Sequence, residues 1–319
     1  MKRAVVTGAS GFVGANLARR LVRDGHETHL LVRPSYRPWR LRDIAGDVRM
    51  HPVELRDSAG TREALLRIRP DWVFHLAAFG AYPAQTGMGA MVETNLMAAV
   101  TLLDACAAMG VEAYVQTGSS SEYGFKDHPA REDEAIEPNS HYAITKAAAT
   151  HYAQFTSRQR GLHAVTLRLY SVYGPYEEPS RLIPTLLVSG FERRLPPLVS
   201  PAVARDFVFV DDAVEAVLQV AAHPGLPRGS VYNVCSGTQS TVASVVALVR
   251  QLLAVAAEPV WSSMESRAWD TNSWVGSPEA IGQQVQWKAR VDMETGLRRT
   301  VEWFRENPDL LEMYSRSIS

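Results

Sequence analysis

Hydrophobic and polar positions along the first half of the chain predict strands that alternate with helices. Short apolar or β-branched runs, typical of buried parallel strands, occupy residues 4–7, 28–32, 72–76, 113–116 and 164–169. After the first run, Val13, Leu17 and Leu21 fall on one helical face, and Gly25 is placed to end that helix. A longer helix is predicted over residues 91–109. Repeated βα units predict an α/β fold, a Rossmann-type doubly wound parallel sheet.

The second half of the chain predicts a smaller lobe. After Leu169 the pattern loosens into loops rich in proline and arginine. Residues 207–222 look like a strand and a helix that return to the main sheet, so the lobe would be assembled from discontinuous pieces. We therefore expect a dinucleotide-binding domain over residues 1–170, to which 205–235 return, and a C-terminal substrate-binding lobe formed mainly by 171–204 and 236–319.

Composition narrows the function classes. The 319 residues suffice for one large domain with a smaller lobe, and 33 basic against 34 acidic side chains lack the charge excess of a protein that binds nucleic acid or an anionic membrane. The two cysteines, Cys106 and Cys235, are too few for a disulfide framework or a thiolate metal site, and they suit a reducing compartment. The first apolar run reaches Gly8 too soon for a signal peptide, so we expect a cytoplasmic protein.

A glycine-rich segment, TGASGFVG, lies between the first predicted strand and the first predicted helix at residues 7–14. Gly8 permits a tight turn, Gly11 lets the backbone approach a pyrophosphate, and Gly14 allows close packing of the helix. The N–H groups at the start of the helix would bind the phosphates. The alternative is an ordinary βα turn, since three glycines alone are a weak signal.

The end of the second predicted strand bears on cofactor choice. An acidic residue there would bind the ribose of NAD, but the chain has Arg33 at this point, followed by Arg37 and Arg40. Such a cluster suits a 2′-phosphate, so NADP is preferred and NAD is possible. The alternative is a solvated loop beside bound NAD. Farther on, Asp57 could reach the adenine amino group or could cap the next helix.

The predicted acid–base pair is Tyr142 and Lys146, which a spacing of four puts on the same face of a helix. We expect nearby positive charge, from Lys146 and the oxidised nicotinamide, to lower the pKa of the phenol. Ser119, Ser120 and Ser121 supply hydroxyls at the carboxyl end of a strand, where ligands of open α/β sheets bind. A tyrosine–lysine pair also arises by chance on helices, so other motifs must support it.

The order of motifs resembles the extended short-chain dehydrogenase/reductase superfamily, the NAD-dependent epimerases, dehydratases and reductases of nucleotide sugars. The resemblance covers nearly the whole chain. Its segments are TGASGFVG, HLAA at 75–78, Asn95 in ETNL, the serines before Tyr123 and Gly124, YAITK at 142–146, LRLYSVYGP at 167–175, RDFVFVDD at 205–212 and NVCSG at 233–237. It implies a Rossmann-type fold and a redox reaction on a nucleotide sugar.

The resemblance also implies roles for single residues. Ser119 matches the catalytic serine or threonine, Tyr142 the acid–base tyrosine, and Lys146 the residue that holds the nicotinamide ribose. The implied cofactor contacts are Gly8, Ser10, Gly11, Phe12, Val13, Gly14, Arg33, Arg37, Leu55, Asp57, Leu76, Ala77 and Ala78, with Tyr142 and Lys146. The implied substrate contacts are Ser120, Ser121, Ser171, Arg181, Arg205 and Arg267; Arg205 and Arg267 match positions that hold the diphosphate, for which Arg181 is a weaker candidate.

Departures from the family pattern narrow the reaction. The family's 4,6-dehydratases usually have an Asp-Glu pair where this chain has Ser120 and Ser121, so standard dehydration is disfavoured. Glu122 is displaced by one position and should face the other way on an extended strand, although an irregular turn would revive dehydration. Ser171 replaces the family's usual asparagine, so the contact made there by relatives is not assured.

Three functions follow from the resemblance. The first is a 4-ketoreductase, in which NADPH delivers hydride to a keto sugar while Tyr142 protonates the oxygen. The alternative is a 4-epimerase on tightly held NAD. A dinucleotide-binding sensor without turnover is disfavoured, because such proteins typically lack the tyrosine or the lysine. Neither the sugar nor its base can be named from the sequence.

A homodimer is the expected assembly, because family members pair the two helices predicted over 91–109 and 142–159. The small residues on these helices that would allow close approach are Ala98, Ala99, Ala147, Ala148 and Ala149. The alternative is that these alanines pack tightly against their own sheet.

Overall fold

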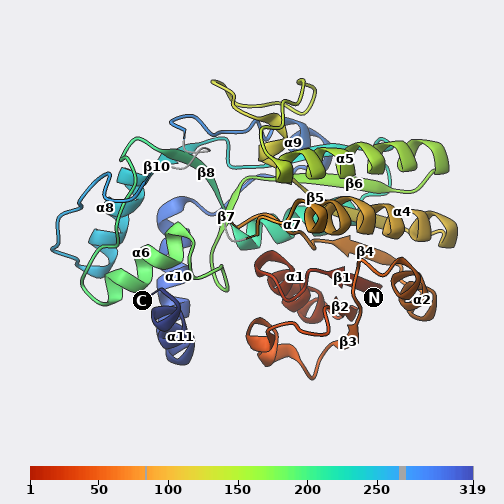
Figure 1. Cartoon of the computed structure of the whole chain (residues 1–319), viewed down its shortest axis with the longest axis horizontal. Coiled ribbons are helices and arrows are strands. Elements are labelled where there is room, and N and C mark those ends of the chain that lie inside the picture. Colours follow the sequence, from red (N-terminus) through yellow and green to blue (C-terminus); the bar gives the residue numbers. More distant parts are fainter. Residues whose placement is uncertain (83–84, 266–270, 319) are drawn as a thin grey trace.

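A seven-stranded parallel sheet forms the centre of the larger domain (Figure 1). The computed structural model describes residues 1–82, 85–265 and 271–318. The strands lie in the order β3 (Arg49–Pro52), β2 (Glu27–Val32), β1 (Arg3–Thr7), β4 (Trp72–His75), β5 (Ala113–Ser119), β6 (Ala164–Leu169) and β9 (Val231–Val234). Five of them were predicted from the apolar runs. The doubly wound sheet with a smaller C-terminal lobe is therefore confirmed.

Helices cover both faces of this sheet because successive strand residues point to opposite sides. In β1, Ala4 and Val6 join one core cluster, whereas Val5 joins the other. The first cluster includes residues of α1 (Phe12–Arg23), α7 (Val210–Ala221) and α9 (Glu279–Val285). The second includes residues of α2 (Ser58–Ile68), α4 (Ala98–Met109) and α5 (His141–Arg160). The inner strands of the central sheet are thus buried between two helical layers, whereas the residues of the edge strand β3 are exposed or half-buried.

The helix predicted over residues 91–109 begins earlier and contains a wide turn. It consists of α3 (Met88–Met91), a π-helical segment (Val92–Met97) and α4. Met88–Met109 is apolar and long enough to cross a membrane, and half of its apolar window is buried inside the protein. Core helices of soluble proteins have the same length and composition, so these properties are weak evidence for a membrane span. The alanines assigned to a dimer surface are largely covered within the chain, since Ala98, Ala99, Ala147 and Ala149 are buried. For these four, the alternative of packing inside the protomer is correct.

The strand expected to return to the main sheet does not do so. β8 (Ala204–Phe209) pairs in parallel with β7 (Ser171–Tyr173) and antiparallel with β10 (Gln239–Thr241), in a separate three-stranded sheet. Only α7 packs back against the central sheet, whose seventh strand is β9. Buried and half-buried residues alternate along most of β8, as in a strand with one face outside the core. The short apolar run in the sequence did not indicate this alternation.

The smaller lobe has its own apolar core. It is formed around the three-stranded sheet by α6 (Leu182–Phe191), α8 (Val242–Leu253), α10 (Met293–Glu306) and α11 (Pro308–Ile318), which Figure 1 shows to one side of the central sheet. Tyr173, Leu186, Val245 and Phe304 are among its buried residues. The lobe lies beyond the carboxyl ends of β5 and β6, which continue into the turn after Ser119 and into β7. Ligands of open α/β sheets bind at these ends.

Candidate functional site

The glycine loop joins β1 to α1 and is packed so tightly that side chains are excluded. Gly8 has a φ of +71°, and a Cβ there would lie 2.5 Å from the backbone nitrogen of Ala77. A Cβ on Gly14 would lie 2.3 Å from the carbonyl oxygen of Gly8. No described side chain caps the N-terminus of α1, which begins after Gly11. The amides of this turn are therefore suited to bind a pyrophosphate, as the spacing predicted.

The other predicted cofactor residues follow the neighbouring strands at the same edge. Leu55 and Asp57 follow β3, and Leu76, Ala77 and Ala78 follow β4. The carboxylate of Asp57 caps α2, because its Oδ1 accepts hydrogen bonds from the amides of Ala59 and Gly60, each at 3.1 Å. The capping alternative for Asp57 thus has direct support.

The three arginines near the second strand have different roles. Arg33 and Arg37 are exposed, whereas Arg40 is buried. The Arg40 guanidinium donates to the carbonyl oxygens of Tyr176 (2.8 Å) and Ser10 (3.3 Å) and forms an ion pair with Glu178 (3.0 Å). Arg40 therefore connects the glycine loop to the loop after β7, and only Arg33 and Arg37 remain exposed at the end of β2.

The predicted catalytic residues meet where β5 ends and α5 begins. Ser140 caps α5 by accepting a hydrogen bond from the amide of Ala143, which places Tyr142 in the first turn and Lys146 in the second. The hydroxyl of Ser119, at the end of β5, interacts with the phenol of Tyr142 and lowers its pKa. Ser119 also shares a hydrogen bond of 2.7 Å with Ser121. Residues far apart in the sequence are thus brought into one site.

The electrostatics of this site differ from the expectation. Burial raises the pKa of Tyr142 to about 12, although the interaction with Ser119 opposes this shift. Burial lowers the pKa of Lys146 to about 8, against the stabilising charge of Glu122. In the protein alone, desolvation outweighs the lowering effect of Arg181, and the predicted lowering of the phenol pKa in the presence of the oxidised nicotinamide stays a prediction. The phenol stays protonated at neutral pH and is poised to donate.

Asn95 connects the loop after β4 to α5, a role that its place in the motif did not indicate. It lies in the π-helical segment, and its side chain exchanges two hydrogen bonds of 2.8 Å with the backbone of Phe79. Its Nδ2 also donates to the hydroxyl of Thr145 at 2.9 Å. The π-helical segment thus holds the loop after β4 against the helix that carries Tyr142 and Lys146.

The predicted extended conformation at Glu122 is wrong, but Glu122 still does not replace the missing carboxylates. Ser120–Tyr123 form a turn of 3-10 helix, which together with Ser119 is called the catalytic turn. The Glu122 side chain is fully buried, and its carboxylate pairs with the Arg168 guanidinium at 2.9 Å. Ser120 is buried too, and its hydroxyl accepts a hydrogen bond of 3.0 Å from the indole nitrogen of Trp274. Trp274 lay outside every sequence motif.

The predicted substrate residues border the site from the lobe. Ser171 begins β7, and Arg205 on β8 lies over the ring of Trp274 at 5.7 Å. Arg181 immediately precedes α6 and pairs with Glu177 at 3.7 Å, and its charge opposes the rise in the pKa of Tyr142. Arg267 lies outside the described residues. The lobe thus places Arg205 beside Trp274, the residue that contacts the catalytic turn.

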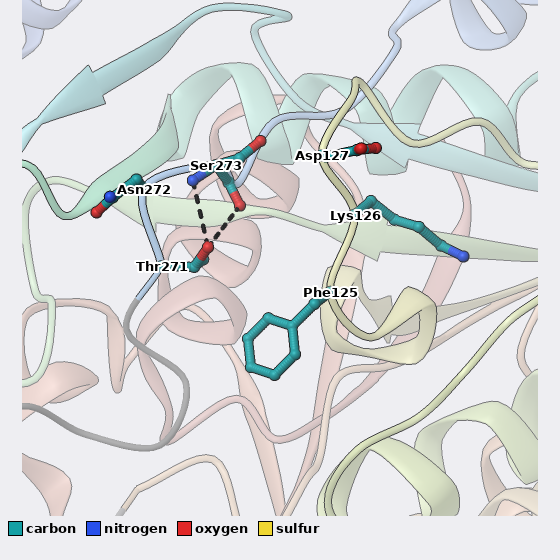
Figure 2. Close-up of a pocket in the computed structure, with 6 residues that line it drawn as sticks. All are labelled: Phe125, Lys126, Asp127, Thr271, Asn272 and Ser273. Carbon is teal, nitrogen blue, oxygen red and sulfur yellow. Dashed lines mark hydrogen bonds between the residues drawn. The ribbon is translucent and has the colours of Figure 1, made fainter.

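A hollow of about 680 Å³ separates the catalytic turn from the lobe (Figure 2). Its lining residues are Phe125, Lys126, Asp127, Thr271, Asn272 and Ser273. Figure 2 shows the Phe125 ring near Thr271, whereas the Lys126 side chain extends away from them. Thr271 and Ser273 are held together by a hydrogen bond of 3.3 Å between the Ser273 amide and the Thr271 hydroxyl. The hollow thus lies between the segment that follows Gly124 and the segment that precedes Trp274.

Comparisons with known proteins agree with this architecture. A model of the NAD dependent epimerase/dehydratase family matches residues 4–235. The probable dTDP-glucose 4,6-dehydratase of Sinorhizobium fredii is 27% identical over 328 residues, which cover 96% of this chain and 93% of the relative. The solved UDP-glucose 4-epimerase of Thermus thermophilus, in complex with NAD, has a TM-score of 0.83 at 28% identity, with 95% and 99% of the two chains covered. The UDP-glucose 4-epimerase of Thermotoga maritima with UDP-glucose has a TM-score of 0.86 at 24% identity, with 96% and 99% covered.

Proposed function

The chain belongs to the NAD dependent epimerase/dehydratase family and is an enzyme of the extended short-chain dehydrogenase type, and from this premise we propose that it reduces a 4-keto nucleotide sugar with NADPH. The observation that carries the proposal is the meeting of Ser119, Tyr142 and Lys146 at the edge of the sheet that also holds the glycine loop. Names of relatives support the substrate class, since they act on dTDP-glucose and UDP-glucose.

The chain's own residues would perform the proton transfer. When bound, the reduced nicotinamide supplies a hydride to the carbonyl carbon. Tyr142 donates its phenolic proton to the carbonyl oxygen, and burial keeps that proton in place at neutral pH. Ser119 interacts with the phenol and would help to orient it, and Lys146 would hold the ribose and stabilise the phenolate that forms. The product is an alcohol, and the phenolate regains a proton from solvent.

A dehydratase function is disfavoured by the catalytic turn, although curated relatives are named dTDP-glucose 4,6-dehydratases. Elimination of water needs groups that remove and return protons at neighbouring carbons. Ser120 and Ser121 stand where the family's dehydratases have carboxylic acids, and the Ser120 oxygen already accepts a hydrogen bond from Trp274. Glu122 is buried in its ion pair with Arg168. We infer that the described residues of this site supply no acid–base pair for elimination.

The second candidate is a 4-epimerase with tightly held NAD. It is favoured by the solved epimerase in complex with NAD. Mixing the protein with NADPH and dTDP-4-keto-6-deoxyglucose separates the functions. A reductase consumes NADPH in proportion to the keto sugar. An epimerase shows no net consumption, and a sensor shows no reaction; either result would overturn the reductase proposal.

The lobe is proposed to bind the nucleotide diphosphate through Arg205 and Arg181, and through Arg267 as the resemblance implies. Arg205 lies on a strand of the lobe beside Trp274, which contacts the catalytic turn, so a ligand between them would lie close to Tyr142. A thermal-shift screen with UDP-, dTDP-, CDP- and GDP-sugars would identify the base, because a bound ligand raises the melting temperature by mass action.

A homodimer in the cytoplasm remains our proposal for the assembly and its location. Exposed apolar side chains lie on the π-helical segment and α5, at Val92, Met97, Ile144 and Phe155. An apolar surface of this kind marks an interaction site. Both cysteines are free and buried, which suits a reducing compartment.

A further inference from the structure

Glu122 is buried directly behind the predicted catalytic serine and is held on three sides. Its Oε1 accepts a hydrogen bond of 2.8 Å from the backbone amide of Ser119. Its Oε2 accepts hydrogen bonds from the Arg168 guanidinium at 2.9 Å and from the Thr150 hydroxyl at 3.0 Å. The side chain is 0% exposed. One carboxylate thus connects the catalytic turn to β6 and to α5.

The local sequence makes room for this carboxylate. A Cβ on Gly118 would lie 2.6 Å from Oε1 of Glu122 and 2.9 Å from the Thr166 side chain, so a larger residue at 118 would displace the carboxylate. The hydroxyl of Ser119 accepts a hydrogen bond from the Ser121 amide, which closes the turn from the other side. Glu122 is therefore one of the residues that hold the catalytic turn in its conformation.

The charge of Glu122 reaches the predicted acid–base pair on α5. It opposes ionisation of Tyr142 and thereby raises the pKa of the phenol, and it also raises the pKa of Lys146 by stabilising the ammonium. Both effects have the sign expected of a buried negative charge.

The groups around the carboxylate fall into two sets. Arg168 compensates the charge directly, and its guanidinium also lies over the Tyr123 ring at 4.4 Å. The charge of Arg168 also acts on Glu132 and lowers the pKa of its carboxyl, against the larger effect of burial. On α5, Thr150 donates to Glu122, and the charge of Glu122 acts on Lys146 and Tyr142. Of these groups, only Lys146 and Tyr142 belong to the predicted catalytic residues.

We propose that Glu122 is a positioning residue that fixes Ser119 and keeps the phenol of Tyr142 protonated to a higher pH. The inference rests on the proposed function, because it assigns the starting protonation state of the same site. In reduction the phenol enters protonated and gives its proton to the carbonyl oxygen. In oxidation of an alcohol Tyr142 must enter as the phenolate, a form that the buried carboxylate makes less populated at a given pH. Glu122 thereby extends to higher pH the range in which Tyr142 is ready for the reductive step.

The test compares the ionisation of Tyr142 in wild type and in Glu122→Gln. Glutamine keeps the shape and an oxygen for the Ser119 amide but removes the charge. Phenolate formation is followed by ultraviolet difference absorbance, with a Tyr142→Phe counterpart of each protein subtracted to isolate this tyrosine. We expect the Tyr142 transition to move down by about half a pH unit or more. A transition that stays in place in the folded variant would overturn the proposal.

A second readout is the pH profile of NADPH consumption with dTDP-4-keto-6-deoxyglucose. In Glu122→Gln the alkaline limb should move to lower pH, with kcat reduced and KM little changed, a split that a general loss of folding would not produce. If wild type does not consume NADPH with this sugar, the proposed function fails while the phenol titration still decides the role of Glu122.

Two further variants keep the test informative. Glu132→Gln is the matched control, because it removes a neighbouring acid that contacts the Asn233 amide and not the catalytic turn; the Tyr142 transition should stay where it is. If Glu122→Gln alone does not fold, because Arg168 is left uncompensated in the core, the double variant Glu122→Gln with Arg168→Gln removes both charges. A smaller downward shift is expected there, because the cation that partly offsets Glu122 is removed with it, and the absence of any shift would equally overturn the proposal.

Discussion

At the scale of single residues, the phenol oxygen of Tyr142 is the atom on which the proposed chemistry depends. Tyr142→Phe removes that oxygen and keeps the ring, so folding and cofactor binding should survive while kcat falls by at least ~10²-fold through loss of the proton donor. The measurement is steady-state NADPH consumption. Tyr152→Phe is the control on the same helix, since its phenol contacts Asp104. Near wild-type turnover of Tyr142→Phe would contradict the assignment.

Cofactor choice is decided by Arg33 if it binds the 2′-phosphate of NADP. Charge-assisted hydrogen bonds there could give a preference of ~10²-fold for NADP over NAD in fluorescence titrations. Arg33→Asp should invert the preference, because a carboxylate repels the phosphate and accepts hydrogen bonds from a free ribose hydroxyl. Arg42→Asp, the same charge change at another exposed arginine, should not. If wild type binds NAD at least as tightly, the epimerase becomes the preferred function.

Glu177 makes stability depend on pH. Burial raises the pKa of its carboxyl from 4.5 to about 8, with Arg181 opposing the shift. Between these values the folded protein holds a proton that the unfolded chain releases, so this group's contribution to stability is lost as pH rises through the window. Glu177→Gln should therefore melt at a higher temperature than wild type at pH 8, by roughly 2 °C or more, and at the same temperature near pH 4.5. Exposed Glu302→Gln should show no such difference between the two pH values.

At the scale of elements, Arg40 joins the glycine loop before α1 to the loop after β7. Arg40→Met removes hydrogen bonds to the carbonyl oxygens of Ser10 and Tyr176, so we expect a loss of about 2 kcal/mol in the free energy of unfolding and weaker cofactor binding. Urea denaturation and cofactor titration measure the two effects. Glu178→Gln removes only the half-exposed ion-pair partner and should cost much less. Equal losses in the free energy of unfolding of the two variants would show that the ion pair, and not the hydrogen bonds to the backbone, joins the two loops.

At the scale of the whole molecule, the exposed apolar residues of α5 and the π-helical segment predict a dimer. Ile144→Glu introduces a charge at the centre of this surface, because Ile144 is 51% exposed and lies on the same face of α5 as Phe155. Light scattering should give twice the chain mass for wild type and the single mass for the variant. Val260→Glu, at an exposed apolar residue of the lobe, should remain dimeric. A wild type that is monomeric at micromolar concentration would contradict the proposal.

The sequence by itself determined the features that depend on near neighbours in the chain. Five strands of the central sheet follow from short apolar runs, and the glycine turn follows from three glycines within seven residues. The placement of Tyr142 and Lys146 on one helix also follows from their spacing, because helical geometry relates residues four apart. These features need only local periodicity and conformational preference.

Tertiary structure alone decided the features that depend on distant partners. The apolar run of β8 pairs with β7 and β10 because that sheet, and not the central one, offers its neighbouring edges. Burial determines the direction of the pKa shift of Tyr142, the ion pair of Glu122 with Arg168 and the inward position of the alanines on α4 and α5. Trp274 contacts Ser120 across 154 positions of sequence. Desolvation and long-range contacts arise only when the chain is packed, so no local pattern carries them.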